Sequence, residues 1–96
     1  MECKLIETSC GCPEQYNVVD TSNQMVGYWR LRHGHFTVEV PDCGGKLILS
    51  EYPDGDGSFT DEERATYFSK AILAMSSFYE EQIFLTNFYE NRENHR

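Results

Sequence analysis

Apolar and polar positions alternate along four segments in the first half of the chain. Segments 15–20, 25–32, 35–40 and 46–52 are rich in aromatic and β-branched residues, and clusters of turn-forming residues separate them. Alternation of this kind is typical of β-strands that bury one face. The pattern therefore predicts four consecutive strands in an antiparallel meander.

The turn at residues 33–34 predicts the register of the central hairpin. A two-residue loop there pairs Leu31 with Phe36 and Trp29 with Val38, which places these four apolar side chains on one face. Agreement between turn chemistry and alternation is what fixes the register of a hairpin. The opposite face then carries four residues of mixed character: Tyr28, Arg30, Thr37 and Glu39.

After Pro53 the apolar residues recur at helical spacing. Thr60 and Glu63 form a capping box, a signature of a helix N-terminus. The pattern predicts a helix over residues 61–91 that covers the apolar face of the sheet. The fold class is therefore α+β, a four-stranded antiparallel β-meander packed by one long C-terminal α-helix in two layers. Eight residues form the apolar stripe of this helix: Ala65, Phe68, Ala71, Ile72, Met75, Phe78, Tyr79 and Ile83.

The 96 residues are predicted to form a single domain. Residues 1–14 are a cysteine-rich N-terminal segment, residues 15–52 the antiparallel sheet, residues 53–60 an acidic loop and residues 61–91 the helix. A helix of that length measures about 45 Å, whereas a domain of this size is only about 30 Å across. Either the helix breaks near residues 86–87, or its last turns project beyond the sheet.

The end of the predicted helix carries more apolar surface than a free helix end usually shows to water. Two interpretations remain open: these side chains fold back onto Leu5 and Ile6, or they form a surface for a second copy of the chain or another protein. The residues concerned are Phe84, Leu85, Phe88 and Tyr89.

The charge balance excludes several classes of function. Sixteen acidic and eight basic residues give a net charge of −8, whereas a protein that binds a phosphate backbone needs a cationic face. No stretch approaches the roughly 20 apolar residues of a membrane span, and the charged residues 1–5 do not resemble a secretory signal. The motifs G-x-x-x-x-G-K, G-x-S-x-G and H-E-x-x-H do not occur. We therefore expect a cytoplasmic protein that is not an enzyme and binds neither nucleic acid directly nor a membrane.

The cysteines favour a structural zinc site. Cysteines of a cytoplasmic protein are more often thiols or metal ligands than disulfides, and Cys10 and Cys12 flank a single glycine, so that two thiolates can face one ion. The hairpin register places position 12 opposite His33. We predict a tetrahedral zinc held by Cys10, Cys12, His33 and either Cys3 or His35. Such a closed site stabilises a fold and is not catalytic.

Cys43 is the most distant candidate for the fourth ligand. It follows the next strand, at the opposite end of the sheet, about 20–25 Å from the turn at His33. The alternative to a metal site is that Cys3 and Cys43 are small buried residues. His33 then occupies its turn because histidine tolerates a positive φ.

The acidic stretch between sheet and helix predicts a surface for a basic partner. The alternatives are a solvated helix start, where the helix dipole favours acids, and a calcium loop. Calcium is disfavoured, because an EF-hand alignment puts Tyr52 at the first ligand position and a strand before the loop. Six acids form the stretch: Glu51, Asp54, Asp56, Asp61, Glu62 and Glu63.

The sheet face away from the helix carries a second charged group of residues. Arg30 and Arg32 lie there with Tyr28 and Glu39. These residues form either an ordinary solvated face or a small protein-binding patch, since arginine and tyrosine are enriched at the centre of protein interfaces.

Three segments resemble small proteins of phages and prophages of Gram-positive bacteria. They are Gly27–Asp42, Tyr52–Gly57 and Asp61–Arg64, and Cys10–Tyr16 resembles the N-terminal segment of those proteins. The resemblance extends over roughly residues 10–65. In size and acidity the chain also resembles the type II anti-CRISPR proteins, which inhibit the single-subunit RNA-guided nuclease of the host.

This resemblance implies a phage-encoded inhibitor that acts in the cytoplasm of the host bacterium. It would bind the type II CRISPR nuclease stoichiometrically and block loading or cleavage of target DNA without a catalytic residue. Such nucleases hold nucleic acid in positively charged channels, toward which a body of charge −8 is steered. The alternative is a structural or regulatory phage protein that forms a homodimer through its long helix.

Overall fold

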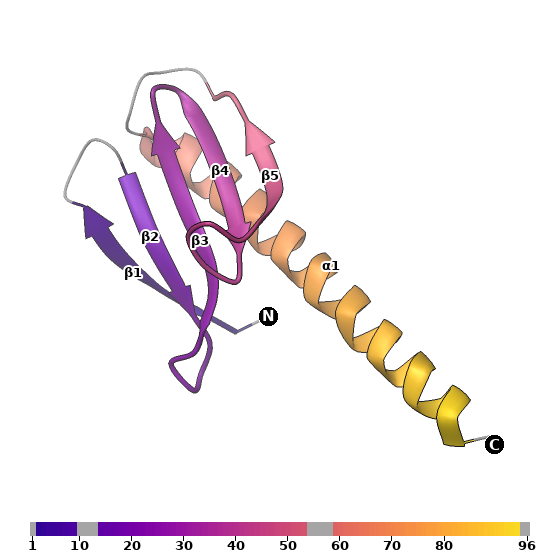
Figure 1. The fold of residues 1–96 in the computed structure, drawn as a ribbon. Helices are drawn as coiled ribbons and strands as arrows, with labels where there is room; N and C mark the ends of the chain where they lie inside the picture. The colour runs from indigo at the N-terminus through magenta and orange to yellow at the C-terminus, as the bar shows by residue number, and fades with distance from the viewer. Residues whose placement is uncertain (1, 10–13, 54–58, 95–96) are drawn as a thin grey trace.

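The computed structural model describes residues 2–9, 14–53 and 59–94 of the chain. They form two layers, an antiparallel sheet and one long helix packed on one of its faces (Figure 1). The strands follow one another in the sheet in chain order, so the predicted meander and the α+β class are confirmed. The elements are β1 (Lys4–Ser9), β2 (Glu14–Val19), β3 (Met25–Arg32), β4 (His35–Val40), β5 (Lys46–Glu51) and α1 (Asp61–Asn94).

The hairpin of β3 and β4 has the predicted register. Leu31 pairs with Phe36, and the other predicted pairs follow in step. The loop residues His33 and Gly34 have φ values of 52° and 73°. A two-residue loop with positive φ matches the right-handed twist of the strands, and histidine is among the few non-glycine residues found in that region. The turn therefore decides which side chains face α1 and which face away.

The described residues contain a fifth strand, β1, which lies within the predicted cysteine-rich N-terminal segment, residues 1–14. β1 pairs with β2 at the edge of the sheet, with Leu5 opposite Val18. Leu5 packs partly against the core, whereas Ile6 is 42 % exposed. A short edge strand buries little of its surface, so its apolar alternation is weak. The prediction of four strands is corrected to five.

Large side chains from both layers form the core. Trp29 and Met75 are completely buried, and the indole N–H of Trp29 donates to the sulfur of Met75 over 3.1 Å. The ring of Phe68 meets Tyr16 and Trp29 edge to face, at centroid distances of 5.2 and 5.0 Å. Burying one such side chain stabilises a fold by about 1.5–3 kcal/mol. These contacts hold α1 against the sheet.

The predicted apolar stripe of α1 covers the sheet only along its middle. Ala71 and Met75 are buried and Phe78 is half-buried, whereas Ala65 and Ile83 are exposed. Strands of six to eight residues span about 20–26 Å, while the 34 residues of α1 span about 51 Å. The helix is therefore about twice as long as the sheet it covers.

α1 continues without a break to Asn94, so of the two predicted outcomes the projecting helix is confirmed. The molecule measures 55 × 25 × 23 Å, and its long axis follows the helix (Figure 1). Packing against the core extends along α1 as far as Tyr79. We call residues 80–94 the distal segment of α1.

A capping box closes the N-terminus of α1, as predicted. The backbone N–H of Thr60 donates to Glu63 over 3.0 Å, and the N–H of Glu63 donates to the hydroxyl of Thr60 over 3.2 Å. Both backbone donors would otherwise lack an intrahelical partner. The helix therefore starts at Asp61, as the sequence indicates.

A buried carboxylate joins β2 to the start of the helix. Glu14 is 6 % exposed, and it accepts hydrogen bonds from the hydroxyl of Tyr16 over 2.8 Å, from Nε of Arg64 over 3.1 Å and from the N–H of Phe59. Burial raises the pKa of Glu14, but the three hydrogen bonds outweigh it, so the pKa lies below its ordinary value. Burial and the hydrogen bond to Glu14 raise the pKa of Tyr16 to about 12.

Candidate functional site

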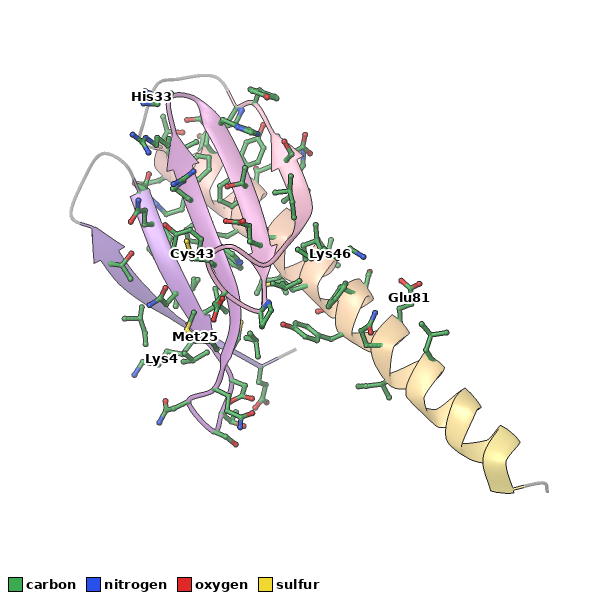
Figure 2. All side chains as sticks on the ribbon, viewed as in Figure 1. Lys4, Met25, His33, Cys43, Lys46 and Glu81 are labelled. Atoms are coloured by element: carbon green, nitrogen blue, oxygen red, sulfur yellow. The ribbon has the colours of Figure 1, made fainter. Side chains whose placement is uncertain are left out.

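The distal segment of α1 presents apolar side chains to solvent. Ile83 is 61 % exposed and Leu85 is 39 % exposed. Exposed acids, Glu80 and Glu81, lie at the start of the segment, where Figure 2 labels Glu81. Exposed apolar side chains beside acids suit a partner surface that is apolar and basic. A hollow of about 260 Å³ adjoins them, lined by Ser76, Tyr79, Glu80 and Ile83.

The base of the distal segment is anchored on the sheet. The hydroxyl of Tyr79 donates to the backbone carbonyl of Val26, and burial raises the pKa of Tyr79. Nζ of Lys46 lies 5.4 Å from the ring centre of Phe78, a cation–π contact. These contacts, together with the continuous helix, set the direction in which the distal segment leaves the sheet.

The interpretation that the end of the helix folds back is not what the structure shows. α1 runs continuously away from the sheet, so its last turns do not return toward Leu5 and Ile6 (Figure 1). The side chains of Phe84, Phe88 and Tyr89 lie outside the described part of the chain. The interpretation of this end as a surface for a partner or a second copy stays a prediction.

The predicted acidic surface falls partly within the described residues. Asp61 and Glu62 are exposed in the first turn of α1, and Asp61 lies 2.9 Å from Nη1 of Arg64. Asp54 and Asp56 lie outside the described residues. An exposed ion pair such as that between Asp61 and Arg64 adds only about 0–1 kcal/mol to the stability of the fold. The carboxylate of Asp61 can therefore exchange this contact for one with a partner.

The other two acids of the predicted surface take part in internal contacts. Glu51 pairs with Lys70 over 3.2 Å, and Glu63 belongs to the capping box with Thr60. Both contacts tie the start of α1 to its surroundings. Of the described acids in this group, Asp61 and Glu62 are therefore the ones best placed to meet a partner.

Two features of the structure concern the calcium interpretation, the side chain of Tyr52 and the element that precedes the loop. Tyr52, at the first position of the EF-hand alignment, stacks its ring on His35 at a centroid distance of 4.3 Å and an interplanar angle of 3°. The element before the loop is the strand β5, as expected. An EF-hand needs a carboxylate in the place of Tyr52 and a helix in the place of β5.

Two of the predicted zinc ligands, Cys3 and His33, lie at opposite ends of the sheet. His33 lies in the turn of β3 and β4, whereas Cys3 precedes Lys4, which pairs with Val19 at the other end of the sheet (Figure 2). The eight residues of β3 separate the two ends by about 25 Å. Since zinc needs ligand atoms about 2.0–2.3 Å away, Cys3 and His33 do not share an ion in this arrangement.

The remaining zinc prediction concerns residues around the turn. Cys10 and Cys12 lie outside the described residues, and Cys43 is exposed in the turn between β4 and β5. In the part of the chain that the structure describes, no group of three or more His, Cys, Asp or Glu residues could hold a metal ion. The zinc site with His35 as the fourth ligand stays a prediction, and metal analysis of untagged protein tests whether Cys10, Cys12, His33 and His35 bind zinc.

The outer face of the sheet, away from α1, carries the predicted arginines. Arg32 is exposed and Arg30 is half-buried, but Tyr28 on the same face is only 8 % exposed. Tyr28 therefore packs within the sheet surface and is not part of an open patch. The basic side chains gather at the turn of β3 and β4, where His33 and His35 join them. The sequence indicated the two arginines as part of a solvated face or a protein-binding patch, but the two histidines were not grouped with them, although the two-residue turn brings all four together.

Comparisons with family models, curated proteins and solved structures found no match to this chain. In the described ranges no helical stretch combines the length and the hydropathy that crossing a membrane requires.

Proposed function

We propose that this chain is a non-catalytic protein ligand that inhibits the type II RNA-guided nuclease of a host bacterium. The observation that carries the proposal is the distal segment of α1, which leaves the sheet at Tyr79 and extends Ile83 and Leu85 into solvent. Its 15 residues span about 22 Å of helix. The identity of the partner rests on the resemblance of residues 10–65 to phage proteins.

Charge supports this choice of partner. The net charge of the chain is −8, and residues 61–94 carry seven acids and three bases. RNA-guided nucleases hold nucleic acid in positively charged channels. Complementary charge speeds the encounter, whereas buried apolar anchors supply most of the affinity. Within the distal segment, Ile83 and Leu85 are exposed apolar side chains that can act as such anchors.

The stiffness of the helix also favours a binding role. α1 is capped at Thr60, packed on the sheet up to Tyr79 and continuous to Asn94. A segment that is already ordered loses little conformational freedom when it binds, so more of the contact energy appears as affinity. A ligand of this kind inhibits by occupying a channel, in proportion to the nuclease present.

A cleavage assay with matched variants tests the proposal. We expect near-equimolar protein to suppress cleavage of target DNA, and the double variant Ile83→Ser, Leu85→Ser to need at least about tenfold more protein. Leu73→Ser is the control, because Leu73 is 67 % exposed on the same helix but outside the distal segment. Equal inhibition by the double variant and the control, both still folded, would move the contact away from the distal segment.

The acids at the start of α1 are proposed as a second contact. The double charge reversal Asp61→Lys, Glu62→Lys leaves the capping box in place. Asp42→Lys, Glu7→Lys is its matched control, because it changes the net charge equally at exposed acids elsewhere. Loss of inhibition in the first variant alone supports a local contact. An equal effect of both variants shows that only the overall charge matters and removes this contact from the proposal.

A homodimer formed through α1 is the second candidate, and the same exposure of Ile83 and Leu85 favours it. Sedimentation of the chain alone at micromolar concentration separates the two functions. A tight dimer that the double variant Ile83→Ser, Leu85→Ser dissociates, combined with no effect on any nuclease, would replace the inhibitor by a dimeric phage protein. A monomer agrees with the inhibitor.

A further inference from the structure

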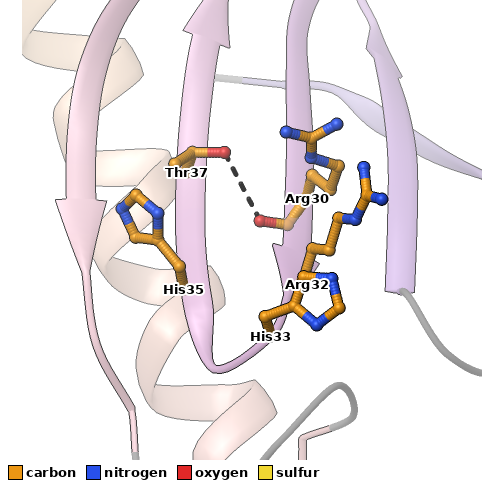
Figure 3. A pocket seen from close by; sticks show the side chains of 5 residues that line it. All are labelled: Arg30, Arg32, His33, His35 and Thr37. Carbon is orange, nitrogen blue, oxygen red and sulfur yellow. Dashed lines mark hydrogen bonds between the residues drawn. The ribbon is translucent and has the colours of Figure 1, made fainter.

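Basic side chains surround a pocket on the outer face of the sheet. Arg30 and Arg32 are two residues apart on β3, so both point away from α1, and their partners across the hairpin are Thr37 and His35. Together with His33 in the turn, these side chains line an open pocket of about 330 Å³ (Figure 3). The two-residue turn thus brings four basic side chains to one end of one face.

The two arginines have no acidic partner within the described residues. All the ion pairs there are made by Arg64 or Lys70, on the other side of the sheet. Glu39 shares the outer face, but it lies opposite Tyr28 and forms no ion pair with Arg30. The chain carries twice as many acids as bases, so two neighbouring guanidinium groups without a carboxylate are unexpected. Their positive charge is open to a ligand.

One wall of the pocket is held in place by the protein. Nε2 of His35 lies 2.6 Å from the hydroxyl of Ser50. The imidazole ring of His35 stacks on the ring of Tyr52 at a centroid distance of 4.3 Å. The hydroxyl of Thr37 reaches the carbonyl of Arg30 only at 3.5 Å, a weak contact that a better acceptor can replace. The pocket therefore combines a fixed imidazole, a hydroxyl and two guanidinium groups.

We propose that this pocket binds a phosphoryl group, either as free phosphate or as the monoester of a small molecule. A phosphate monoester carries about −1.5 to −2 charges at neutral pH and three strong acceptor oxygens, which matches two guanidinium forks and a hydroxyl. A carboxylate has one charge and two oxygens, which a single guanidinium group satisfies. A volume of about 330 Å³ is at the small end of ligand pockets. The proposal does not rest on nuclease inhibition.

The proposal is tested by titrating the full chain and recording amide chemical shifts. The probes are inorganic phosphate, adenosine 5′-monophosphate and acetate. We expect saturable shifts confined to residues 28–38 and 50–52 with both phosphates, and shifts at least about tenfold weaker with acetate. Phosphate and the monoester binding equally identifies the free ion as the ligand, and tighter binding of the monoester identifies a nucleotide-like ligand. Equal response to acetate and phosphate overturns the proposal.

Matched variants separate this site from general charge effects and from a metal. Arg30→Gln, Arg32→Gln is expected to weaken phosphate binding at least about tenfold, whereas Lys4→Gln, Lys46→Gln removes the same charge elsewhere and leaves it unchanged. Arg30→Lys, Arg32→Lys keeps the charge without the fork and gives an intermediate affinity. Arginine does not ligate zinc, so the effect reports on the anion and not on a metal at His33. Unchanged binding in the folded arginine variants contradicts the proposal.

Discussion

Two adjacent glycines in the turn of β4 and β5 are needed for different physical reasons. Gly44 has φ of +87° in open space, and Gly45 approaches the backbone so closely that an added Cβ would lie 2.2 Å from the carbonyl oxygen of Val40. Gly45 also donates its N–H to Asp42 over 3.0 Å. The first position requires a particular backbone conformation, and the second requires the absence of a side chain.

The two positions respond differently to alanine. Gly44→Ala is expected to lower the free energy of unfolding by about 1 kcal/mol, the usual cost of a left-handed conformation with a Cβ. Gly45→Ala is expected to cost more than about 2 kcal/mol, because a backbone atom cannot yield as a side chain does. Urea unfolding of both variants measures the difference. Equal losses would show that the turn relaxes around a Cβ at Gly45.

Glu14 shows how one buried charge stabilises a junction between elements. It is the buried acid of the described core, and its partners Phe59 and Arg64 come 45 and 50 residues later. Its pKa in the folded protein lies below the ordinary value of 4.5. The stabilisation is therefore present in full above about pH 4.5 and is lost as the pH falls through the lowered pKa.

Glu14→Gln tests this pH dependence. The variant is expected to lose about 1.5–3 kcal/mol of stability at pH 7, because it weakens hydrogen bonds to a charged group. The difference from the wild type should shrink toward zero as the pH falls well below 4.5. Unfolding curves at several pH values measure it, with Glu7→Gln as an exposed control on β1. A difference that does not change with pH would assign the loss to packing.

At the scale of elements, α1 has two parts with different roles. The part up to Tyr79 is packed on the sheet, whereas the described side chains of the distal segment do not belong to that packing. Met75→Ala is therefore expected to cost about 2–5 kcal/mol, because it opens a cavity and leaves the indole N–H of Trp29 without its acceptor. Ile83→Ala is expected to change stability by less than about 0.5 kcal/mol. Similar losses from thermal unfolding of the two variants would mean that the distal segment packs on something in the folded chain.

The β3–β4 hairpin and the start of α1 were predictable from the sequence, because a turn motif and a capping box determine them locally. The hairpin of β3 and β4 was predicted with its register, because turn and alternation agree at residues 33–34. The start of α1 was predicted from the capping box. β1 was not predicted, because it buries little beyond Leu5. No register was predicted for β5, because the loop at residues 43–45 is compatible with two lengths. A β-bulge between Val38 and Glu39 sets that register, and bulges have no clear sequence signal.

The candidate sites were less predictable than the fold. The network of Glu14 joins residues far apart in the sequence, and no local pattern indicates that an isolated glutamate will be buried. The predicted hairpin register already places Arg30, Arg32 and His35 on one face, but the contacts of His35 with Ser50 and Tyr52 come from β5 and the residue after it, whose register was not predicted. Of the two predicted choices for the fourth zinc ligand, Cys3 would have to loop back toward His33, which the pairing of β1 with β2 prevents, whereas His35 lies beside the turn.

At the scale of the whole molecule, shape and charge agree with a binding protein. A body 55 Å long and 25 × 23 Å across combines a net charge of −8 with a stiff helix whose exposed end carries apolar side chains. Steering by charge predicts that association with a cationic partner slows as ionic strength rises. The anion pocket lies on the outer face of the sheet, so both proposed sites can be occupied at once.

Cleavage of target DNA by a panel of type II RNA-guided nucleases, with and without this protein, tests the central claim most directly. We predict that at least one nuclease loses cleavage when the protein reaches about one equivalent, and that further protein adds nothing. The stoichiometry should be independent of incubation time, because nothing is turned over. Full cleavage by every nuclease at excess protein and low salt, with no complex formed, would contradict the inhibitor account.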